Sequence, residues 1–227
     1  MRIRARAAAQ AAAILVAASA GACVAPPLGF GTSARIPAPP GLGSIEARTA
    51  VGLGPGRQTY QAELSSTFRF GGWFGLEAGA VVTHLTQDVD GGGTLTLNSA
   101  FPFLRPRFFV DRFSLAIGLS GLGFGGGGGG IVGGIADAQL GYGTDTWTLY
   151  TGAYRHYFEL VSEDAIVASS SQLRVGGQYT RRLGRGRIGL ALELHRQRDD
   201  LRNDPYQQSS HFWGAALKLS LTSRSFR

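Results

Sequence analysis

Large aliphatic residues alternate with small or polar ones along much of the chain, most clearly between Arg187 and His195. Large aliphatics occupy every second position of that segment: Ile188, Leu190, Leu192 and Leu194. The positions between them hold glycine, alanine and glutamate. Successive side chains of a β-strand point to opposite faces, so this pattern predicts a strand with one apolar face and one small, polar face.

Similar alternation recurs in ten segments, each about long enough to cross a membrane as a tilted strand. We expect strands near 44–53, 58–70, 73–85, 101–110, 113–122, 131–142, 146–158, 171–181, 187–195 and 211–221. Connections after the even-numbered segments are short and most of the others are longer, which is typical of bacterial transmembrane barrels. The sequence therefore predicts an all-β fold, an antiparallel up-and-down transmembrane β-barrel of about ten strands, with 8–12 allowed.

The first 22 residues are predicted to be a secretory signal peptide, because arginines precede an alanine-rich stretch that is too short to span a bilayer. Cys23, the only cysteine, follows Ala20-Gly21-Ala22. These residues fit an ordinary signal-peptidase site, and they also resemble a bacterial lipoprotein box, which implies lipidation of Cys23. Residues 23–43 are rich in proline and glycine and are expected to form a linker. The barrel is expected to occupy 44–227.

Charge and hydropathy fit an exported barrel better than other classes. The formal charge of +7 includes three arginines of the signal peptide, and the remaining basic residues are scattered. Without a basic stripe we expect no nucleic-acid partner. A mean hydropathy of +0.02 is too polar for a helical membrane protein, whereas a barrel exposes only half of each strand to lipid.

Charged residues of both signs fall on the small, polar faces that we assign to the lumen. They are Glu46, Arg48, Glu63, Arg69, Glu77, Arg105, Arg107, Asp137, Arg174, Glu193, His195 and Lys218. In so small a barrel the interior is about as wide as its side chains, and buried charges must pair. We favour a salt-bridge network that plugs the lumen; a narrow pore with a mild anion preference is the other interpretation.

Candidate catalytic groups are few. Glu193 with His195, and the string Ser209-Ser210-His211, are the nearest to a catalytic set, but short polar strings of this kind often arise by chance. The histidines have no compact metal-ligand spacing, and the run Gly125–Gly130 lacks the lysine and hydroxyl residue of a phosphate-binding loop. We therefore expect no enzymatic activity, no metal and no cofactor.

The region from Ser44 onward resembles the outer-membrane β-barrel class of Gram-negative bacteria. Aromatic residues lie near strand ends, as in membrane-interface girdles: Tyr60, Phe70, Trp73, Trp147, Tyr157 and Trp213. In the last strand, Gly214, Leu217 and Leu219 resemble the spacing of the signal that the barrel assembly machinery reads, although Phe226 is penultimate. The resemblance implies an outer-membrane location, with membrane lipid and that machinery as partners.

Function is less sharply indicated than architecture. We expect a structural or interaction barrel or a narrow pore, with outer loops at 86–100, 159–170 and 196–210 available to a surface ligand. One alternative is an outer-membrane barrel enzyme acting on lipid A or peptides. Another is a soluble exported β-barrel that binds a small apolar ligand, in which the aliphatic faces would point inward.

Overall fold

A computed structural model describes residues 43–89, 93–121, 130–161, 166–184, 186–203 and 206–223. The predicted signal peptide, Cys23, nearly all of the expected linker, most of the glycine run and Phe226 lie outside the described residues. Within the described ranges no helix is long and apolar enough to cross a membrane.

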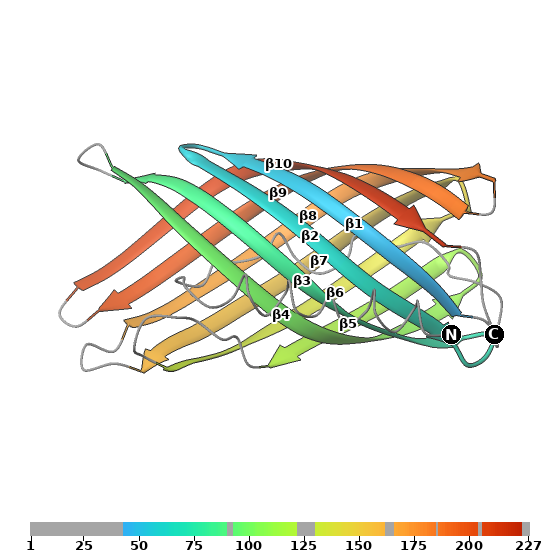
Figure 1. Cartoon of the computed structure of the whole chain (residues 1–227), viewed down its shortest axis with the longest axis horizontal. Helices are drawn as coiled ribbons and strands as arrows, with labels where there is room; N and C mark the ends of the chain where they lie inside the picture. Colours follow the sequence, from blue (N-terminus) through green and yellow to red (C-terminus); the bar gives the residue numbers. More distant parts are fainter. Residues whose placement is uncertain are drawn as a thin grey trace, which may run out of the picture.

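Ten antiparallel strands close into a single barrel (Figure 1). The strands are β1 (Gly43–Gly54), β2 (Arg57–Arg69), β3 (Phe74–Val89), β4 (Gly93–Val110), β5 (Phe113–Gly121), β6 (Gly130–Gly143), β7 (Trp147–Val161), β8 (Ile166–Leu183), β9 (Gly186–Asn203) and β10 (Tyr206–Thr222). Each pairs with its sequence neighbours, and β10 closes on β1 from Glu46 opposite Thr222 to Leu53 opposite Ala215. The expected fold and strand number are confirmed, and the pairing of β10 with β1 closes the sheet.

Several strands continue beyond the limits that the sequence pattern suggested. Residues 86–89 and 93–100, 159–161 and 166–170, and 196–203 and 206–210 belong to paired strands, so the prediction of long outer loops there was wrong. A hairpin that leaves the membrane needs no apolar face, and its alternation of hydrophobicity ends before its hydrogen bonding does. The strands accordingly project to different extents along the barrel axis at the left-hand end of Figure 1.

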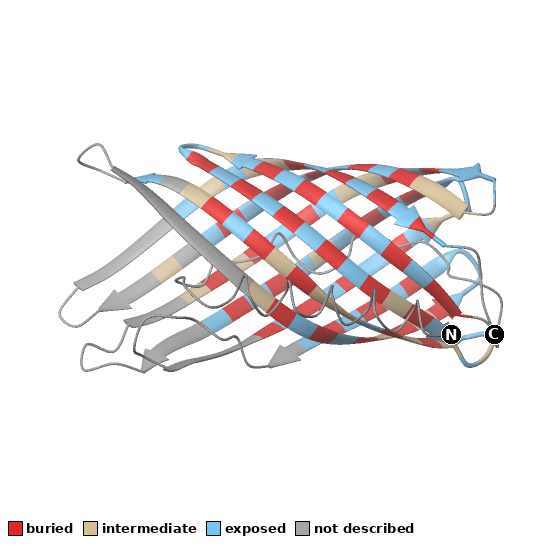
Figure 2. Ribbon diagram, in the orientation of Figure 1, coloured by how far each residue is buried: buried red, intermediate tan, exposed pale blue. Residues whose placement is uncertain are grey.

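The wall is apolar outside and polar inside. Buried and exposed residues alternate along the strands (Figure 2), and the exposed positions include Leu64, Leu140, Leu192 and Leu217. A soluble barrel would turn these leucines inward, so the soluble alternative is wrong. A closed barrel with an apolar exterior satisfies its backbone internally and presents aliphatic groups to lipid. The chain therefore has the architecture of a transmembrane β-barrel.

Aromatic side chains mark the two edges of the apolar band. At the end of the barrel that carries the β6–β7 turn, ring centroids pair at 4.7–6.1 Å: Trp73 with Phe108, Phe113 with Tyr142, and Trp147 with Tyr179. Tyr60, His84, Tyr157 and Trp213 lie toward the other end of their strands. On β7, Trp147 and Tyr157 are about ten residues apart, the span that a tilted strand needs to cross the bilayer.

The outward face yields a first prediction. Leu192 lies near the middle of the span of β9 and is 61% exposed, so we expect Leu192→Arg to lower the free energy of unfolding by about 2–4 kcal/mol. Gln58→Arg, also outward but at the end of β2, should change it by at most about 1 kcal/mol. Denaturant unfolding in lipid vesicles measures both values, and equal effects would contradict the assigned lipid face.

Candidate functional site

A connected cluster of buried charges crosses the lumen. At one side, Arg48 of β1 donates from Nη2 to Glu46 Oε2 at 3.1 Å and to Glu77 Oε1 of β3 at 2.9 Å. Its Nη1 donates to Glu63 of β2. A single guanidinium therefore joins carboxylates from three neighbouring strands.

Glu77 carries the cluster toward the opposite wall. Its Oε2 lies 3.3 Å from Arg107 Nη1 and 3.5 Å from Arg105 Nη1, both from β4. Arg105 Nη2 reaches Asp137 Oδ2 of β6 at 2.7 Å, and Arg174 Nη2 of β8 reaches Asp137 Oδ1 at 2.6 Å. The contacts step from β1 to β3, β4, β6 and β8, and β3 and β8 are five strands apart in the ten-stranded sheet, so the cluster joins opposite sides of the barrel.

A separate buried ion pair joins β9 and β10. Lys218 Nζ of β10 donates to Glu193 Oε2 of β9 at 2.6 Å. The cluster and this pair together hold equal numbers of cations and carboxylates: Arg48, Arg105, Arg107, Arg174 and Lys218, with Glu46, Glu63, Glu77, Asp137 and Glu193. None of these side chains is more than 7% exposed. The lumen therefore contains a neutral set of charges with almost no access to solvent.

Two residues assigned to the network by sequence lie apart from these ion pairs. Arg69 is the last residue of β2, and its guanidinium donates to the backbone carbonyls of Gly71 and Gly72 and lies 5.0 Å from the ring of Phe109. The prediction that Arg69 belongs to the lumen network is therefore corrected. Its side chain stabilises the β2–β3 turn at the rim of the barrel. His195 is buried on the inner face of β9, directly opposite Gly214.

Glycines on the inner face make room for these large side chains. A Cβ on Gly152 would lie 2.8 Å from Arg174 Nε, and a Cβ on Gly214 would overlap the His195 ring. In each case the glycine is the register partner of the residue that folds across it. The same relation holds for Gly79 with Phe103 and for Gly176 with Tyr150. Glycine opposite a large residue thus lets a narrow interior hold arginine and aromatic side chains.

An apolar layer adjoins the charge cluster. It consists of Val81, Phe101, Phe103, Ile135 and Tyr154. These residues lie on the hairpin side of Glu77, Arg105 and Asp137 along β3, β4 and β6. The ring of Phe101 also makes an edge contact with buried His156, with 5.5 Å between centroids. The interior is filled by a polar layer and an apolar layer.

This second layer was missed in the sequence. Strict alternation backward from Arg107 and Arg105 places Phe103 and Phe101 inside, but Pro102 and Pro106 obscured the continuity of β4. On β7, aromatics on both faces hid the phase, and the structure buries Tyr150, Tyr154 and His156. Trp147 and Tyr157 both face outward. Strict alternation along the strand between them would have placed Tyr150, Tyr154 and His156 inside.

The structure does not assemble a catalytic set from the candidates. Glu193 and His195 face the lumen, with Glu193 held by Lys218, whereas His211 is exposed on the outer face of β10. The wall of the barrel therefore separates His211 from the Glu193–His195 pair. In the ranges that the structure describes, no three His, Cys, Asp or Glu side chains are grouped to hold a metal ion.

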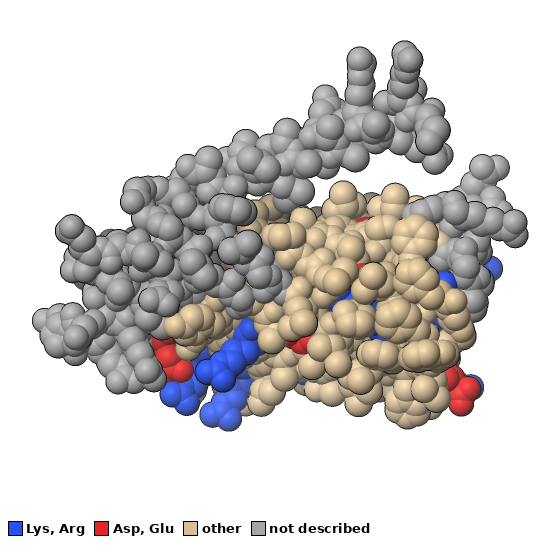
Figure 3. All heavy atoms as spheres, turned by 90° about the horizontal axis from the view of Figure 1, so that it is seen from below, with Lys and Arg blue, Asp and Glu red and all other residues tan. Residues whose placement is uncertain are grey.

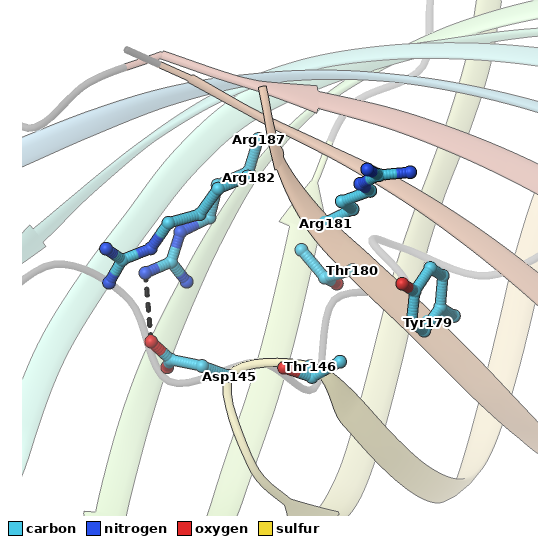
Figure 4. Close-up of a pocket in the computed structure, with 7 residues that line it drawn as sticks. All are labelled: Asp145, Thr146, Tyr179, Thr180, Arg181, Arg182 and Arg187. Atoms are coloured by element: carbon cyan, nitrogen blue, oxygen red, sulfur yellow. Dashed lines mark hydrogen bonds and ion pairs between the residues drawn. The ribbon is translucent and has the colours of Figure 1, made fainter. Parts of the chain in front are cut away.

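A basic pocket lies at the end of the barrel opposite the long hairpins. It has a volume of about 370 Å³ and is formed by the β6–β7 turn with the ends of β8 and β9, including Arg181, Arg182 and Arg187. Arg187 Nη2 donates to Asp145 Oδ2 at 2.9 Å. Figure 4 shows Arg182 beside Arg187 and Arg181 directed to the other side. The pocket is polar and open, and its cations outnumber its single carboxylate.

Comparison with solved structures finds other barrels. The translocator domain of the autotransporter NalP from Neisseria meningitidis has a TM-score of 0.47 and 10% identity, over 81% of this chain and 88% of that chain. The β-domain of the Bordetella autotransporter BrkA has a TM-score of 0.44 and 10% identity, over 80% and 98%. The outer-membrane protease OmpT from Escherichia coli has a TM-score of 0.35 and 8% identity, over 86% and 100%. No protein-family model and no curated protein matched the sequence.

The central position of Glu77 yields a second prediction. Glu77→Gln removes the carboxylate shared by Arg48, Arg105 and Arg107, leaving buried cations in excess, and should lower the free energy of unfolding by about 3–5 kcal/mol. Glu46→Gln is the matched control: Arg48 keeps two other carboxylates, so the loss should be clearly smaller. Denaturant unfolding in vesicles compares the two, and a larger loss for the control would be inconsistent with a hub at Glu77.

The glycine pairs yield a third prediction. A Cβ at position 152 would lie 2.8 Å from Arg174 Nε and 2.9 Å from the carbonyl oxygen of Ala138, so Gly152→Ala should destabilise the barrel by about 1–3 kcal/mol. Gly177, on the neighbouring strand, is the control, because its Cβ would meet only Leu149 Cδ2 at 3.5 Å. Gly177→Ala should be neutral or slightly stabilising in the same unfolding measurement. Similar effects at both positions would refute the packing role of Gly152.

Proposed function

We propose that this chain is a closed, non-enzymatic barrel of the outer membrane that serves as a structural or interaction platform. The observation that carries the proposal is the ion-pair cluster that crosses the lumen from Arg48 to Arg174. Open pores present charges to water, whereas the described charges here are paired with one another and almost fully buried.

The composition of the interior supports closure over conduction. An anion-preferring pore needs an excess of positive charge along its path, but the five cations and five carboxylates of the buried ion pairs balance. The apolar layer of Val81, Phe101, Phe103, Ile135 and Tyr154 adds a second barrier beside the charges, because apolar constrictions exclude water and ions.

The hairpins support a role in interaction. β3–β4, β7–β8 and β9–β10 continue as paired strands well past Tyr157 and Trp213, to Val89, Val161 and Asn203. A filled barrel holds such hairpins on a rigid base, where a ligand in the external medium can reach them. The non-enzymatic part of the proposal is supported by the separation of His211 from Glu193 and His195 across the wall.

Planar-bilayer recording tests closure. We expect the full chain to insert without steady single-channel conductance. The charge-neutral variant Glu77→Ala with Arg105→Ala, combined with Phe101→Ala, thins both interior layers and should conduct. Gln58→Ala, outward and outside both layers, is the control and should stay silent. Steady conductance by the unmodified chain that changes when Arg105 or Arg107 is reversed in charge would overturn the proposal in favour of a narrow pore.

A further inference from the structure

Exposed cations gather at one place on the outer wall, at the hairpin side of the apolar band. Arg155 of β7, Arg196 and Arg198 of β9, and the neighbouring His211 of β10 are all exposed on the outer face. On the face shown in Figure 3, Lys and Arg side chains likewise gather toward one end of a largely uncharged wall, beside an acidic side chain. The outward faces of β1, β2, β4, β5 and β6 carry no charged residue among the positions whose exposure the structure describes.

The strand register brings these residues together. Arg155 is opposite Ser171 of β8, Ser171 is opposite Arg198, and Arg198 is opposite His211. Residues in such a row are about 4.8 Å apart from one strand to the next, so the two arginines flank the small Ser171 side chain. Arg196 belongs to the next outward-facing row, between Leu173 and Trp213. Three guanidinium groups therefore surround one short stretch of β8.

The wall is hollowed at this place. A pocket of about 390 Å³ is lined by outward-facing residues that include Ala153, Ser171, Leu173, Arg196, Arg198 and His211. The small side chains of Ala153 and Ser171 line the hollow together with Arg196 and Arg198. Arg155 is not among its lining residues but is the register partner of Ser171. The hollow is open, and its size suits one headgroup rather than a protein segment.

The excess of positive charge at this place favours the binding of an anion. Arg198 Nε donates to Asp200 Oδ1 at 3.0 Å, which leaves the Nη groups of Arg198 for other partners. Within the residues that the structure describes, no ion pair is seen for Arg155 or Arg196. Arg155 lies one outward-facing row inside Tyr157, and Arg196 lies in the row of Trp213. At this aromatic level the membrane interface provides lipid headgroups on one side and acyl chains on the other.

We propose that this outer-wall site, lined by Ser171, Arg196, Arg198 and His211 and flanked by Arg155 beside Ser171, binds the phosphate group of a lipid headgroup. The arginine forks donate paired hydrogen bonds to phosphate oxygens, and the Ser171 hydroxyl donates another. Below the site, Leu173, Val175 and Leu194 are exposed and continue the apolar band, so the acyl chains of the same molecule lie along them. The site is on the outer face and does not depend on whether the lumen conducts.

Tryptophan quenching by brominated lipids tests the site. Trp213 is opposite Arg196, and Trp73→Phe with Trp147→Phe leaves it as the only tryptophan of the chain. The full chain in phosphatidylcholine vesicles is titrated with phosphatidic acid that carries brominated acyl chains, and separately with brominated phosphatidylcholine. We expect phosphatidic acid to be preferred at Trp213 by about thirtyfold, because each of two arginines contributes about 1 kcal/mol.

Variants assign the preference to the arginines. Arg155→Gln with Arg196→Gln should bring the preference close to onefold, whereas Arg181→Gln, outward at the opposite end of β8, should leave it unchanged. Arg155→Lys with Arg196→Lys, which keeps the charge but removes the forks, should give an intermediate value. Heat-modifiable migration on gels confirms that each variant is folded.

Three results would overturn the proposal. The first is equal quenching by the two lipids with the unmodified arginines. The second is a preference that survives Arg155→Gln with Arg196→Gln. The third is loss of the preference when excess inorganic phosphate is added, which would show that the site takes a soluble phosphate rather than a lipid. None of these outcomes affects the conductance test, so the site and the closed lumen can fail separately.

Discussion

The narrowness of the lumen is the constraint on which the rest of this structure depends. A ten-stranded barrel leaves little room for water around inward-facing charges, and an unpaired buried charge costs several kcal/mol. The buried charges satisfy this constraint by sharing partners: each of Arg48, Glu77 and Asp137 forms ion pairs with more than one residue. A carboxylate shared between guanidinium groups satisfies more of its lone pairs than an isolated ion pair does, so the cluster stabilises the interior as a unit.

The same constraint explains where small residues occur. On β5, the strand beside the two arginines of β4, the inward positions are Ser114, Ala116 and Gly118, and Arg107 is the register partner of Ala116. A strand without inward bulk leaves space for the side chains of its neighbour. The high glycine content of the chain, which by itself suggests flexible loops, is therefore partly a property of the packed interior.

Much of the fold could be predicted because a membrane imposes a simple pattern. The alternation from Ile188 to Leu194 is visible because lipid demands aliphatic residues at every second position, and it placed Glu193 and His195 inside correctly. Beyond the membrane the alternation of aliphatic and polar residues ends. Residues 196–203 were therefore predicted to be a loop, although they are paired with β10. Partners across the lumen, such as Arg105 with Asp137, depend on strand tilt and side-chain reach, which a linear sequence does not reveal. The exposed cluster around Arg196 fell in that same misassigned segment.

The glycine positions also bear on how the strands find their alignment. A strand pair can slip by two residues and keep every side chain on its proper face, so the apolar pattern alone does not reject such an error. In β7 and β8 a slip of two residues would set Arg174 against Tyr150 or Tyr154 instead of Gly152. Two bulky groups would then compete for the space that one now fills. The glycines therefore favour a single alignment of neighbouring strands. Because the alignments of all strand pairs together determine the shear of a closed barrel, these residues help to set it through the side chains that they lack.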